Sequence, residues 1–274
     1  MEKDKLILKY DDFILQEHYT FVNESFGLDD IKEYLIKVFK RISKASKDHK
    51  KKILIAALTL VMAASSEYSK ILNIINSDDF IKSEINSTPE LSDILYEKLG
   101  FKDPNSFRLS QKGWDHIKLS EGDAKNPGKP VLAAYKLGDG RITIGWGHAE
   151  PENTSKYKEG EKVSKIEAQK LLKEDLKVAA DGVRRMFSQW KSEKINRKIT
   201  QEMFDVLVSI SFNAGVGGLR KSEIAKEIKK GNYKIAGELI KTFNTDPKFP
   251  GLKNRRDKES DMFLTYQDSV DLDS

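Results

Sequence analysis

The chain has 274 residues, of which 33% are charged and 38% hydrophobic, and its formal net charge at pH 7 is +5. This length suits one large domain or two modest ones, and the absence of cysteine excludes a disulfide framework, a thiolate nucleophile and a Cys-ligated metal site. Lysine and arginine alternate with acidic residues, as on solvated helices, which argues against the one-sided basic stripe of a nucleic-acid-binding protein.

The first hundred residues predict an all-α module. Apolar side chains fall on one helical face in residues 28–45, and related patterns cover residues 67–82 and 91–99. Residues 50–66 combine three lysines with an apolar run and resemble a signal peptide. They would be a true signal peptide only if the chain started near residue 50. The run is too short to span a bilayer. We therefore expect a buried helix, no stable membrane insertion, and synthesis in the cytoplasm without a signal peptide.

A turn-rich segment, residues 102–106, is the best candidate for a linker between two modules. It divides the chain into an N-terminal helical module, residues 1–105, and a second domain, residues 106–274. The charge is uneven, because the second domain carries 32 Lys and Arg against 25 Asp and Glu. A basic domain of this kind is attracted to an anionic polymer, and bacterial cell wall fits as well as nucleic acid does.

The second domain opens with a short predicted helix, residues 110–120. Ser110 can cap its start, and Trp114 and Ile117 lie three residues apart on one face. Glu121 then falls in the last turn, where Gly122 would supply a left-handed stop. The negative end of the helix dipole would favour the neutral form of the Glu121 carboxyl, the form that a general acid needs. An ordinary solvated glutamate is the alternative.

Two short runs that follow predict a β-hairpin. Residues 133–137 and 141–146 are joined by Gly138-Asp139-Gly140, which supplies typical turn residues. In the second run the isoleucines share one face of the strand, while Arg141, Thr143 and Gly145 share the other. That second face is small and polar, and it leaves room for a ligand. The alternative is a structural hairpin with a packed threonine.

The remainder of the domain predicts an all-helical lobe. Ser164 and Glu167 form a capping box at the start of a long helix that runs to about Trp190. Thr200 caps the next helix, whose apolar residues should form the centre of the lobe and which we expect to end at Asn213 and the glycines that follow. Further helices are expected over residues 222–230, 233–243 and 255–264.

The order of these features resembles the phage-type lysozymes, glycoside hydrolase family 24. The resemblance rests on Glu121-Gly122, on Ala134-Tyr135 before the turn, and on the run TIGWGH, residues 143–148. It continues through the segment TQEMFDVLVSISFN at residues 200–213 and through Gly251-Leu252 with Arg255-Arg256. In all it covers residues 106–265. The resemblance implies an α+β fold in which a small β-hairpin lobe and a helical lobe leave a substrate cleft between them.

The resemblance also implies roles for individual residues. Glu121 matches the family's catalytic acid, and Thr143 matches the threonine thought to hold the attacking water. The family's aspartate should stand two residues after Tyr135, where this chain has Leu137. Asp139 in the turn is our first candidate to take over its role, and Asp123 is a weaker one. A third possibility is a chain without a second carboxylate, in which Glu121 alone supports a transglycosylase.

Five further residues are predicted to bind substrate or surround the active site, each with a structural alternative. Tyr135 and Trp146 either stack on sugar rings or pack the small sheet. His148 belongs to the active-site surroundings in the family, although a lone histidine there is more often structural. Asn213 either lines the cleft or caps its helix, and Arg256, with Arg255, either binds acidic groups of the glycan or bridges helices. The other histidines are scattered, so no metal site and no cofactor are expected.

The function that follows is hydrolysis of the β-1,4 bond between N-acetylmuramic acid and N-acetylglucosamine in peptidoglycan, as in an endolysin or a virion-associated lysin. Two alternatives remain, a lytic transglycosylase and a catalytically impaired wall-binding structural protein. We expect peptidoglycan as the partner, without nucleic acid. The N-terminal module would serve docking to a phage particle or an export partner, and the enzyme would reach the cell wall after release, export or virion delivery.

Overall fold

The computed structural model describes residues 28–42, 57, 100–123, 125–245 and 250–268. The chain divides into two compact units, one made of residues 1–101 with 266–274 and the other of residues 102–265. The predicted boundary at residue 105 lies four residues from this division.

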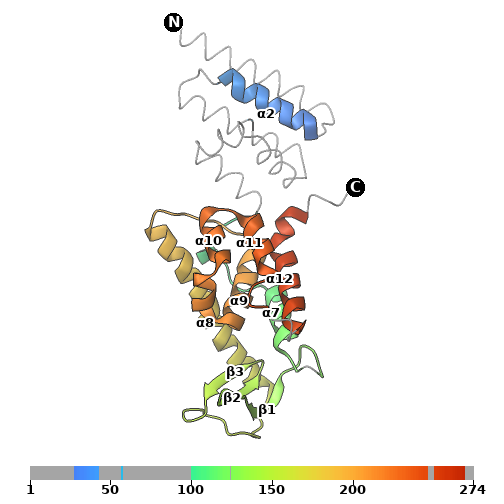
Figure 1. The fold of residues 1–274 in the computed structure, drawn as a ribbon, viewed down its shortest axis with the longest axis vertical. Helices are drawn as coiled ribbons and strands as arrows, with labels where there is room; N and C mark the ends of the chain where they lie inside the picture. The colour runs from blue at the N-terminus through green and yellow to red at the C-terminus, as the bar shows by residue number, and fades with distance from the viewer. Residues whose placement is uncertain (1–27, 43–56, 58–99, 124, 246–249, 269–274) are drawn as a thin grey trace. The chain divides into compact units, whose positions relative to one another are not determined.

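In the first unit the structure describes helix α2 (Leu28–Ile42), shown in blue in Figure 1. Leu35 and Val38 are completely buried, as the apolar spacing predicts. The predicted helix over residues 28–45 is thus confirmed as far as Ile42. The predicted helices further along this module, including the signal-like segment, lie outside the described residues apart from the buried Ala57.

The second unit has a small antiparallel sheet at one end and a group of helices at the other (Figure 1). The α+β class predicted from the sequence is therefore confirmed for this unit. Its elements in chain order are η1 (Pro104–Ser106), α7 (Gln111–Glu121), β1 (Val131–Lys136), β2 (Arg141–Gly145), β3 (His148–Pro151), α8 (Lys165–Ser192), α9 (Gln201–Lys221), α10 (Glu223–Lys230), α11 (Tyr233–Ile240) and α12 (Pro250–Asp268).

The sheet has the strand order β1-β2-β3, and the predicted hairpin forms its first two strands. Tyr135 pairs with Thr143 across that hairpin. Ile142 and Ile144 are buried and form a small core with Ala134 and Leu171, as the alternation in β2 predicts. Strand β3 was not predicted, because four residues with little apolar character carry almost no strand signal.

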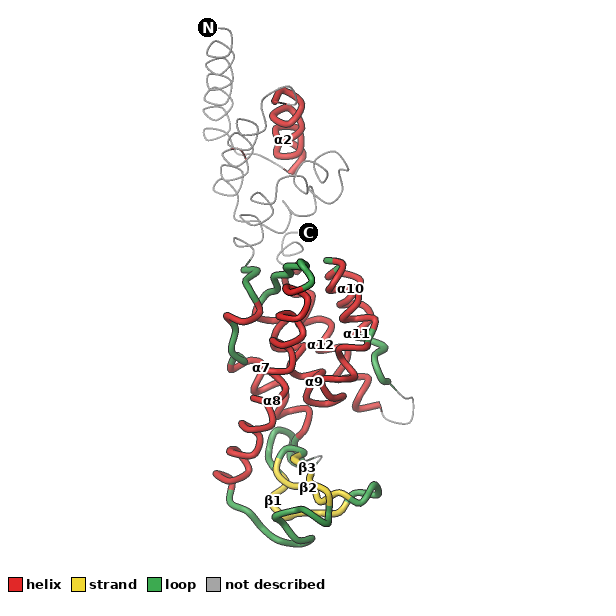
Figure 2. The backbone as a smooth tube through the Cα atoms, turned by 90° about the vertical axis from the view of Figure 1, so that its left-hand side faces the viewer, coloured by secondary structure: helices red, strands yellow, loops and turns green. Residues whose placement is uncertain are grey.

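Helix α8 links the sheet to the helical lobe (Figure 2). Its start is the predicted one, since the Ser164 hydroxyl accepts a hydrogen bond from the Glu167 amide at 3.1 Å. Its first turns pack on β2 and its later turns on α9. The expected core contacts are all buried, and they are Leu172, Leu176, Ala179, Val183, Met186, Phe187 and Trp190.

Helix α9 runs through the centre of the helical lobe. Thr200 caps it as predicted, accepting a hydrogen bond from the Met203 amide at 3.3 Å. The first helical segment of α9 ends just after Asn213, as predicted, and a second segment, which was not predicted, continues beyond a kink to Lys221. The kink is at Gly215, whose φ of +77° is readily available to glycine and costly for other residues.

The last three helices complete this lobe largely as expected. Ser222 caps α10, and Gly231 ends it in the left-handed conformation. Helix α11 ends at Ile240, three residues earlier than predicted, and α12 begins at Pro250, five residues earlier. Phe263 on α12 is completely buried, so this helix contributes to the core of the lobe.

Gly122 ends α7, but not in the predicted way. Its φ of −71° and ψ of 170° are extended, so the predicted left-handed stop is wrong. Glycine is needed here for space, because a Cβ atom would lie 2.5 Å from the backbone nitrogen of Gly128. The chain at Gly128 therefore packs tightly against the end of the helix.

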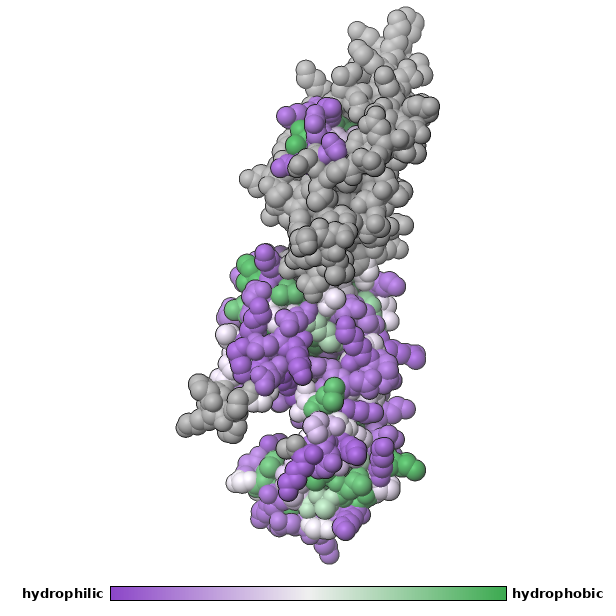
Figure 3. Space-filling model, turned by 90° about the vertical axis from the view of Figure 1, so that its right-hand side faces the viewer, coloured by the Kyte–Doolittle hydropathy of each residue, from purple (hydrophilic) through white to green (hydrophobic). Residues whose placement is uncertain are grey.

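Hydrophilic residues cover most of the helical part of this unit, and hydrophobic residues are interspersed with hydrophilic ones over the sheet on the face drawn in Figure 3. Several of the larger apolar side chains are exposed, among them Tyr135, Leu137 and Val178. Within the described residues, no helix combines the length and the apolar character needed to cross a bilayer.

Candidate active site

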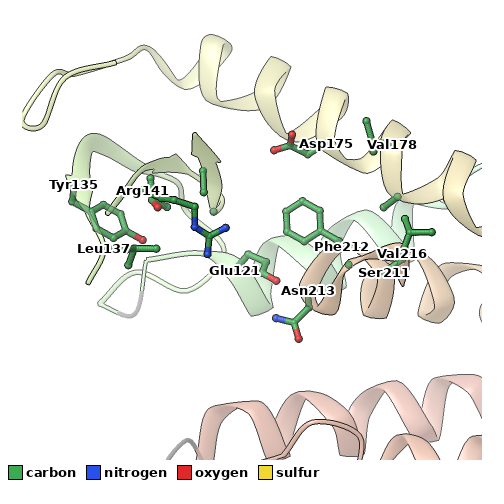
Figure 4. Close-up of a pocket in the computed structure, with 15 residues that line it drawn as sticks. Glu121, Tyr135, Leu137, Arg141, Asp175, Val178, Ser211, Phe212, Asn213 and Val216 are labelled. Atoms are coloured by element: carbon green, nitrogen blue, oxygen red, sulfur yellow. The ribbon is translucent and has the colours of Figure 1, made fainter. Parts of the chain in front are cut away.

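A cleft of about 600 Å³ lies where the end of α7, the sheet, α8 and α9 meet (Figure 4). The predicted catalytic residues Glu121 and Thr143 both line it, together with Tyr135 and Asn213. Residues from positions 121 to 216 thus converge on one cavity. The cleft accordingly draws on both the sheet and the helical lobe.

Glu121 lies at the wall between this cleft and a second cavity of about 530 Å³, which it also lines. Its carboxyl oxygens face different partners. Arg255 donates a hydrogen bond to Oε1. Oε2 lies beside Gly147, since a Cβ atom added to Gly147 would be 3.5 Å from this oxygen. The helix dipole is therefore not the sole electrostatic influence on this carboxyl, because a guanidinium contacts it directly.

Arg255 is held by a buried carboxylate on its own helix. Its Nε donates to Oε1 of Glu259 at 3.0 Å, and Arg256 donates to Oε2. Glu259 has no solvent exposure. Burial raises the pKa of the Glu259 carboxyl, but His116 at 3.6 Å and the two arginines outweigh it and lower the pKa to about 2. A chain of buried charges thus supports the guanidinium that contacts Glu121.

Tyr135, Leu137 and Arg141 line the end of the cleft that the hairpin forms. Burial and the nearby negative charge of Glu121 raise the pKa of the Tyr135 phenol, which therefore stays a hydrogen-bond donor at neutral pH. Leu137 is 36% exposed and presents an apolar side chain where the family pattern has a carboxylate. This end of the cleft carries a guanidinium and no carboxylate in its lining.

Asp139 does not line the cleft. It lies exposed in the turn, where Oδ1 accepts the Arg141 amide at 3.1 Å and Oδ2 accepts Arg141 Nε at 2.8 Å. These hydrogen bonds lower the pKa of the Asp139 carboxyl. Asp123 is also outside the lining, and it accepts hydrogen bonds from Asn126 and Lys125 within its own loop. The catalytic role predicted for Asp139 stays a prediction, and in this structure Arg141 occupies its carboxylate.

Two residues that line the cleft carry a buried hydroxyl without a partner among the residues that the structure describes. These hydroxyls are Thr143 Oγ1 and Ser211 Oγ, each in a side chain that is 3% exposed. A buried hydroxyl that makes no hydrogen bond is costly, so such groups in a cleft are suited to a water molecule or a ligand. For Thr143 this agrees with the role that the sequence predicts.

His148 lies behind the cleft and does not line it. Its Nδ1 is 2.9 Å from Oδ2 of Asp175, and its Nε2 is 3.3 Å from Oε1 of Glu150. The hydrogen bond to Asp175, opposed by partial burial and supported by both negative charges, raises the pKa of the His148 ring. The ring ties β3 to α8 and thereby holds Asp175, which does line the cleft (Figure 4).

We expect this ring to make stability depend on pH. A raised folded-state pKa means that His148 contributes stability in full below about pH 6.5, the ordinary value, and that the contribution disappears as pH rises through the folded-state pKa. The free energy of unfolding of wild type, followed by tryptophan fluorescence, should therefore fall between pH 6 and pH 8 by more than that of His148→Asn. An equal change in both proteins would contradict this.

The remaining predicted binding residues have structural contacts. Trp146 is 2% exposed and donates through Nε1 to the carbonyl of Gly128 at 3.2 Å, so its ring packs the sheet and cannot stack on a sugar here. Arg256 is completely buried, so it bridges helices and does not reach the cleft. Asn213 lines both cavities while its Oδ1 accepts a hydrogen bond from Arg256 at 2.6 Å.

Sequence reasoning placed Arg141 on the face of Thr143 but gave it no role, and it missed Asp175 and Glu259. Glu259 follows Arg255 and Arg256 at helical ion-pair spacings. Asp175 has no local signal. Among the described residues, no group of three or more histidines or carboxylates is arranged to hold a metal ion.

Part of the chain is similar to known proteins. Residues 130–259 match the phage lysozyme family, which confirms the resemblance found in the sequence. The chain is 33% identical over 159 residues to the endolysin of Bacillus phage B103, covering 57% of this chain and 54% of that protein. It is 26% identical over 159 residues to the endolysin of Salmonella phage P22, covering 58% of this chain and 99% of that protein. The chain therefore spans about half the length of the Bacillus phage endolysins that it matches.

Among solved structures, an endolysin from Escherichia coli O157:H7 phage FAHEc1 is 31% identical, with a TM-score of 0.46. That similarity covers 58% of this chain and 94% of the endolysin. The muramidase domain of SpmX from Asticaccaulis excentricus is 26% identical, with a TM-score of 0.47. That similarity covers 57% of this chain and 97% of the muramidase domain.

Proposed function

We propose that this domain is a peptidoglycan muramidase, a glycoside hydrolase that cleaves the β-1,4 bond between N-acetylmuramic acid and N-acetylglucosamine, because residues 130–259 match the phage lysozyme family. The observation that carries the proposal is the Glu121 carboxyl at the wall shared by two open cavities. A glycan strand laid across both cavities would present a glycosidic oxygen to that carboxyl. Glycoside hydrolysis requires a proton donor at this oxygen.

Glu121 is the proton donor in this proposal. Its Oε1 accepts the hydrogen bond from Arg255, so the transferable proton belongs on Oε2, the oxygen beside Gly147. Proton transfer to the glycosidic oxygen releases the leaving sugar and leaves positive charge on the anomeric carbon. Arg255 stabilises the Glu121 carboxylate that forms, and Glu259 keeps Arg255 in place.

Thr143 positions the attacking water. Its hydroxyl is buried, lines the cleft and lacks a partner among the described residues, so it can hold a water molecule by one hydrogen bond. Attack of that water on the anomeric carbon gives a reducing N-acetylmuramic acid end, and the proton that the water loses passes to solvent. Asp139 would assist as a second carboxylate only after the turn released it from Arg141.

A lytic transglycosylase is the second candidate, and Leu137 favours it. The residue lines the cleft in the place of the family's aspartate, and the carboxylates in the described lining are Glu121 and Asp175, of which Asp175 is bound to His148. Without a second free carboxylate, the substrate's own hydroxyl would attack the anomeric carbon and give a 1,6-anhydro sugar. This route needs Glu121 alone.

Mass spectrometry of fragments released from purified peptidoglycan separates these candidates. Reducing ends that persist in Asp139→Asn and Asp123→Asn support a hydrolase that uses Glu121 and Thr143, and loss with Asp139→Asn alone identifies Asp139 as the second carboxylate. Anhydro ends support the transglycosylase. If the wild type binds sacculi but releases nothing, the enzyme proposal is wrong and the wall-binding alternative replaces it.

Thr143→Val tests the role of the buried hydroxyl. Valine has nearly the same shape and removes an oxygen that has no partner, so we expect the free energy of unfolding to be unchanged or to rise by about 1 kcal/mol. Turnover should fall by about tenfold to a hundredfold, because the water loses a hydrogen bond that orients it. Denaturation and fragment release measured on the same preparation check both. A destabilised variant with unchanged turnover would contradict this assignment.

The place of action in this proposal is the bacterial cell wall. The basic charge of the second domain suits this anionic polymer. Residues 1–105 would serve docking or delivery rather than chemistry, since all residues that line the cleft lie between positions 121 and 216. Neither nucleic acid nor stable membrane insertion is part of the proposed function.

A further inference from the structure

Arg141 is the feature of the cleft that the proposed mechanism leaves unexplained. It begins β2, two residues before Thr143, and its side chain lines the cleft. Figure 4 shows it extending from the sheet with its guanidinium directed toward Glu121. A positive charge close to an anomeric carbon that becomes positive would oppose bond cleavage. The guanidinium therefore calls for a negative partner when substrate is bound.

Asp139 fixes the direction of the Arg141 side chain but leaves some of its N–H donors without a partner. The carboxylate accepts the Arg141 amide at one oxygen and Nε and Nη2 at the other. The two side chains are 52% and 48% exposed, so the pair is weakened by water and contributes little energy. Nη1 has no partner in the part of the chain that the structure describes. A donor pair from Nη1 and Nη2 is thus available to a second anion.

The surroundings of the guanidinium define what it can bind. Leu137 and Tyr135 line the same end of the cleft, so the site is a cation beside an apolar and an aromatic surface. A planar guanidinium matches a carboxylate, which it can hold by two parallel hydrogen bonds. Because Glu121 lines the same cavity, we expect the anion to belong to a sugar unit close to the scissile bond.

We propose that Arg141 is a specificity-determining residue that binds a carboxylate carried by the N-acetylmuramic acid unit next to the scissile bond, and that Asp139 is its positioning residue. This inference rests on the proposed function. The carboxylate has two possible sources, the lactyl group of a muramic acid without peptide and the acidic groups of the stem peptide. Binding either one brings a negative charge that offsets Arg141 during cleavage.

The test measures binding in a Glu121→Gln background, so that strands stay intact. Soluble glycan strands are prepared in three forms: with stem peptides, with peptides removed by an amidase so that the lactyl carboxylate is free, and with all carboxylates converted to neutral amides. We expect Arg141→Gln to weaken binding of one carboxylate-bearing form by about tenfold. Asp139→Asn should weaken the same form by a smaller factor, with the free energy of unfolding unchanged. Arg108→Gln, an exposed arginine outside the cleft, is the matched control.

The form that responds identifies the source of the carboxylate. The amidated strands should bind the Arg141 and Arg141→Gln proteins equally. An equal loss of affinity for all three forms would overturn the inference, because the effect would then not depend on the carboxylate. If wild type cleaves no strand but Arg141→Gln still loses carboxylate-dependent binding, the proposed muramidase is wrong while the binding site stands. If no form binds, both fail.

Discussion

Glu121→Gln should lower the rate of glycan cleavage by the full chain by about a thousandfold or more, in the upper part of the range for loss of general acid catalysis. Glutamine keeps the shape of the side chain and can still accept the hydrogen bond from Arg255. It has no proton to transfer to a glycosidic oxygen, so both the hydrolase and the transglycosylase should lose activity. Binding to sacculi should persist, because the walls of the two cavities are unchanged.

Release of soluble fragments from sacculi, normalised to folded protein by circular dichroism, measures this effect. Glu223→Gln is a matched control, since that side chain is 63% exposed on α10 and lines neither of the two cavities. We expect the control to cleave at the wild-type rate. A Glu121→Gln protein that retained a tenth of the wild-type rate would show that another group protonates the leaving oxygen.

Local features of the sequence predicted the start of several elements correctly. Ser110, Ser164, Thr200 and Ser222 each cap the helix that they precede, because a cap depends on a hydrogen bond to an amide three residues away. The alternation in β2 likewise placed Thr143 on the cleft side. These interactions lie within a few residues of one another, so spacing alone was sufficient to predict them.

Long-range contacts set the rest of the site, and spacing carries no information about them. The guanidinium that faces Glu121 comes from Arg255, 134 residues further along the chain. Gly122 was predicted to adopt a left-handed conformation, but its backbone is extended. A glycine is needed there because Gly128 approaches too closely for a Cβ atom, and that approach depends on how the chain after Gly122 folds. Asp139 is the exception, because the contact that occupies its carboxylate is local and comes from Arg141, only two residues away.

Glu259→Gln should destabilise residues 102–265 by about 3 to 5 kcal/mol, the usual cost of removing one partner from a buried ion pair. The variant leaves Arg256, which has no solvent exposure, and the nearly buried Arg255 without their shared carboxylate. Ser209 also loses a charged acceptor, which its hydroxyl contacts at 2.6 Å. The pKa of Glu259 gives a similar figure, because a shift from 4.5 to about 2 corresponds to about 3 kcal/mol.

The pH dependence gives this prediction a second readout. A carboxyl with a lowered folded-state pKa contributes stability that is present above its unfolded value of 4.5 and is lost as pH falls toward 2. Wild type should therefore lose stability between pH 5 and pH 3 more steeply than Glu259→Gln. The three tryptophans, at positions 114, 146 and 190, all lie in residues 102–265, so their fluorescence follows this unit alone.

Glu193→Gln is the control that separates the effect of burial on stability from the effect of ion pairing. Glu193 also pairs with a cation, Lys229, but its side chain is 41% exposed, so we expect a loss of less than about 1 kcal/mol and little change in acid stability. Similar losses for the Glu193 and Glu259 variants would contradict the view that burial gives Glu259 its importance. A large loss for Glu259→Gln alone would mean that burial makes Glu259 important to the helical lobe, whose Arg255 contacts both Glu259 and Glu121.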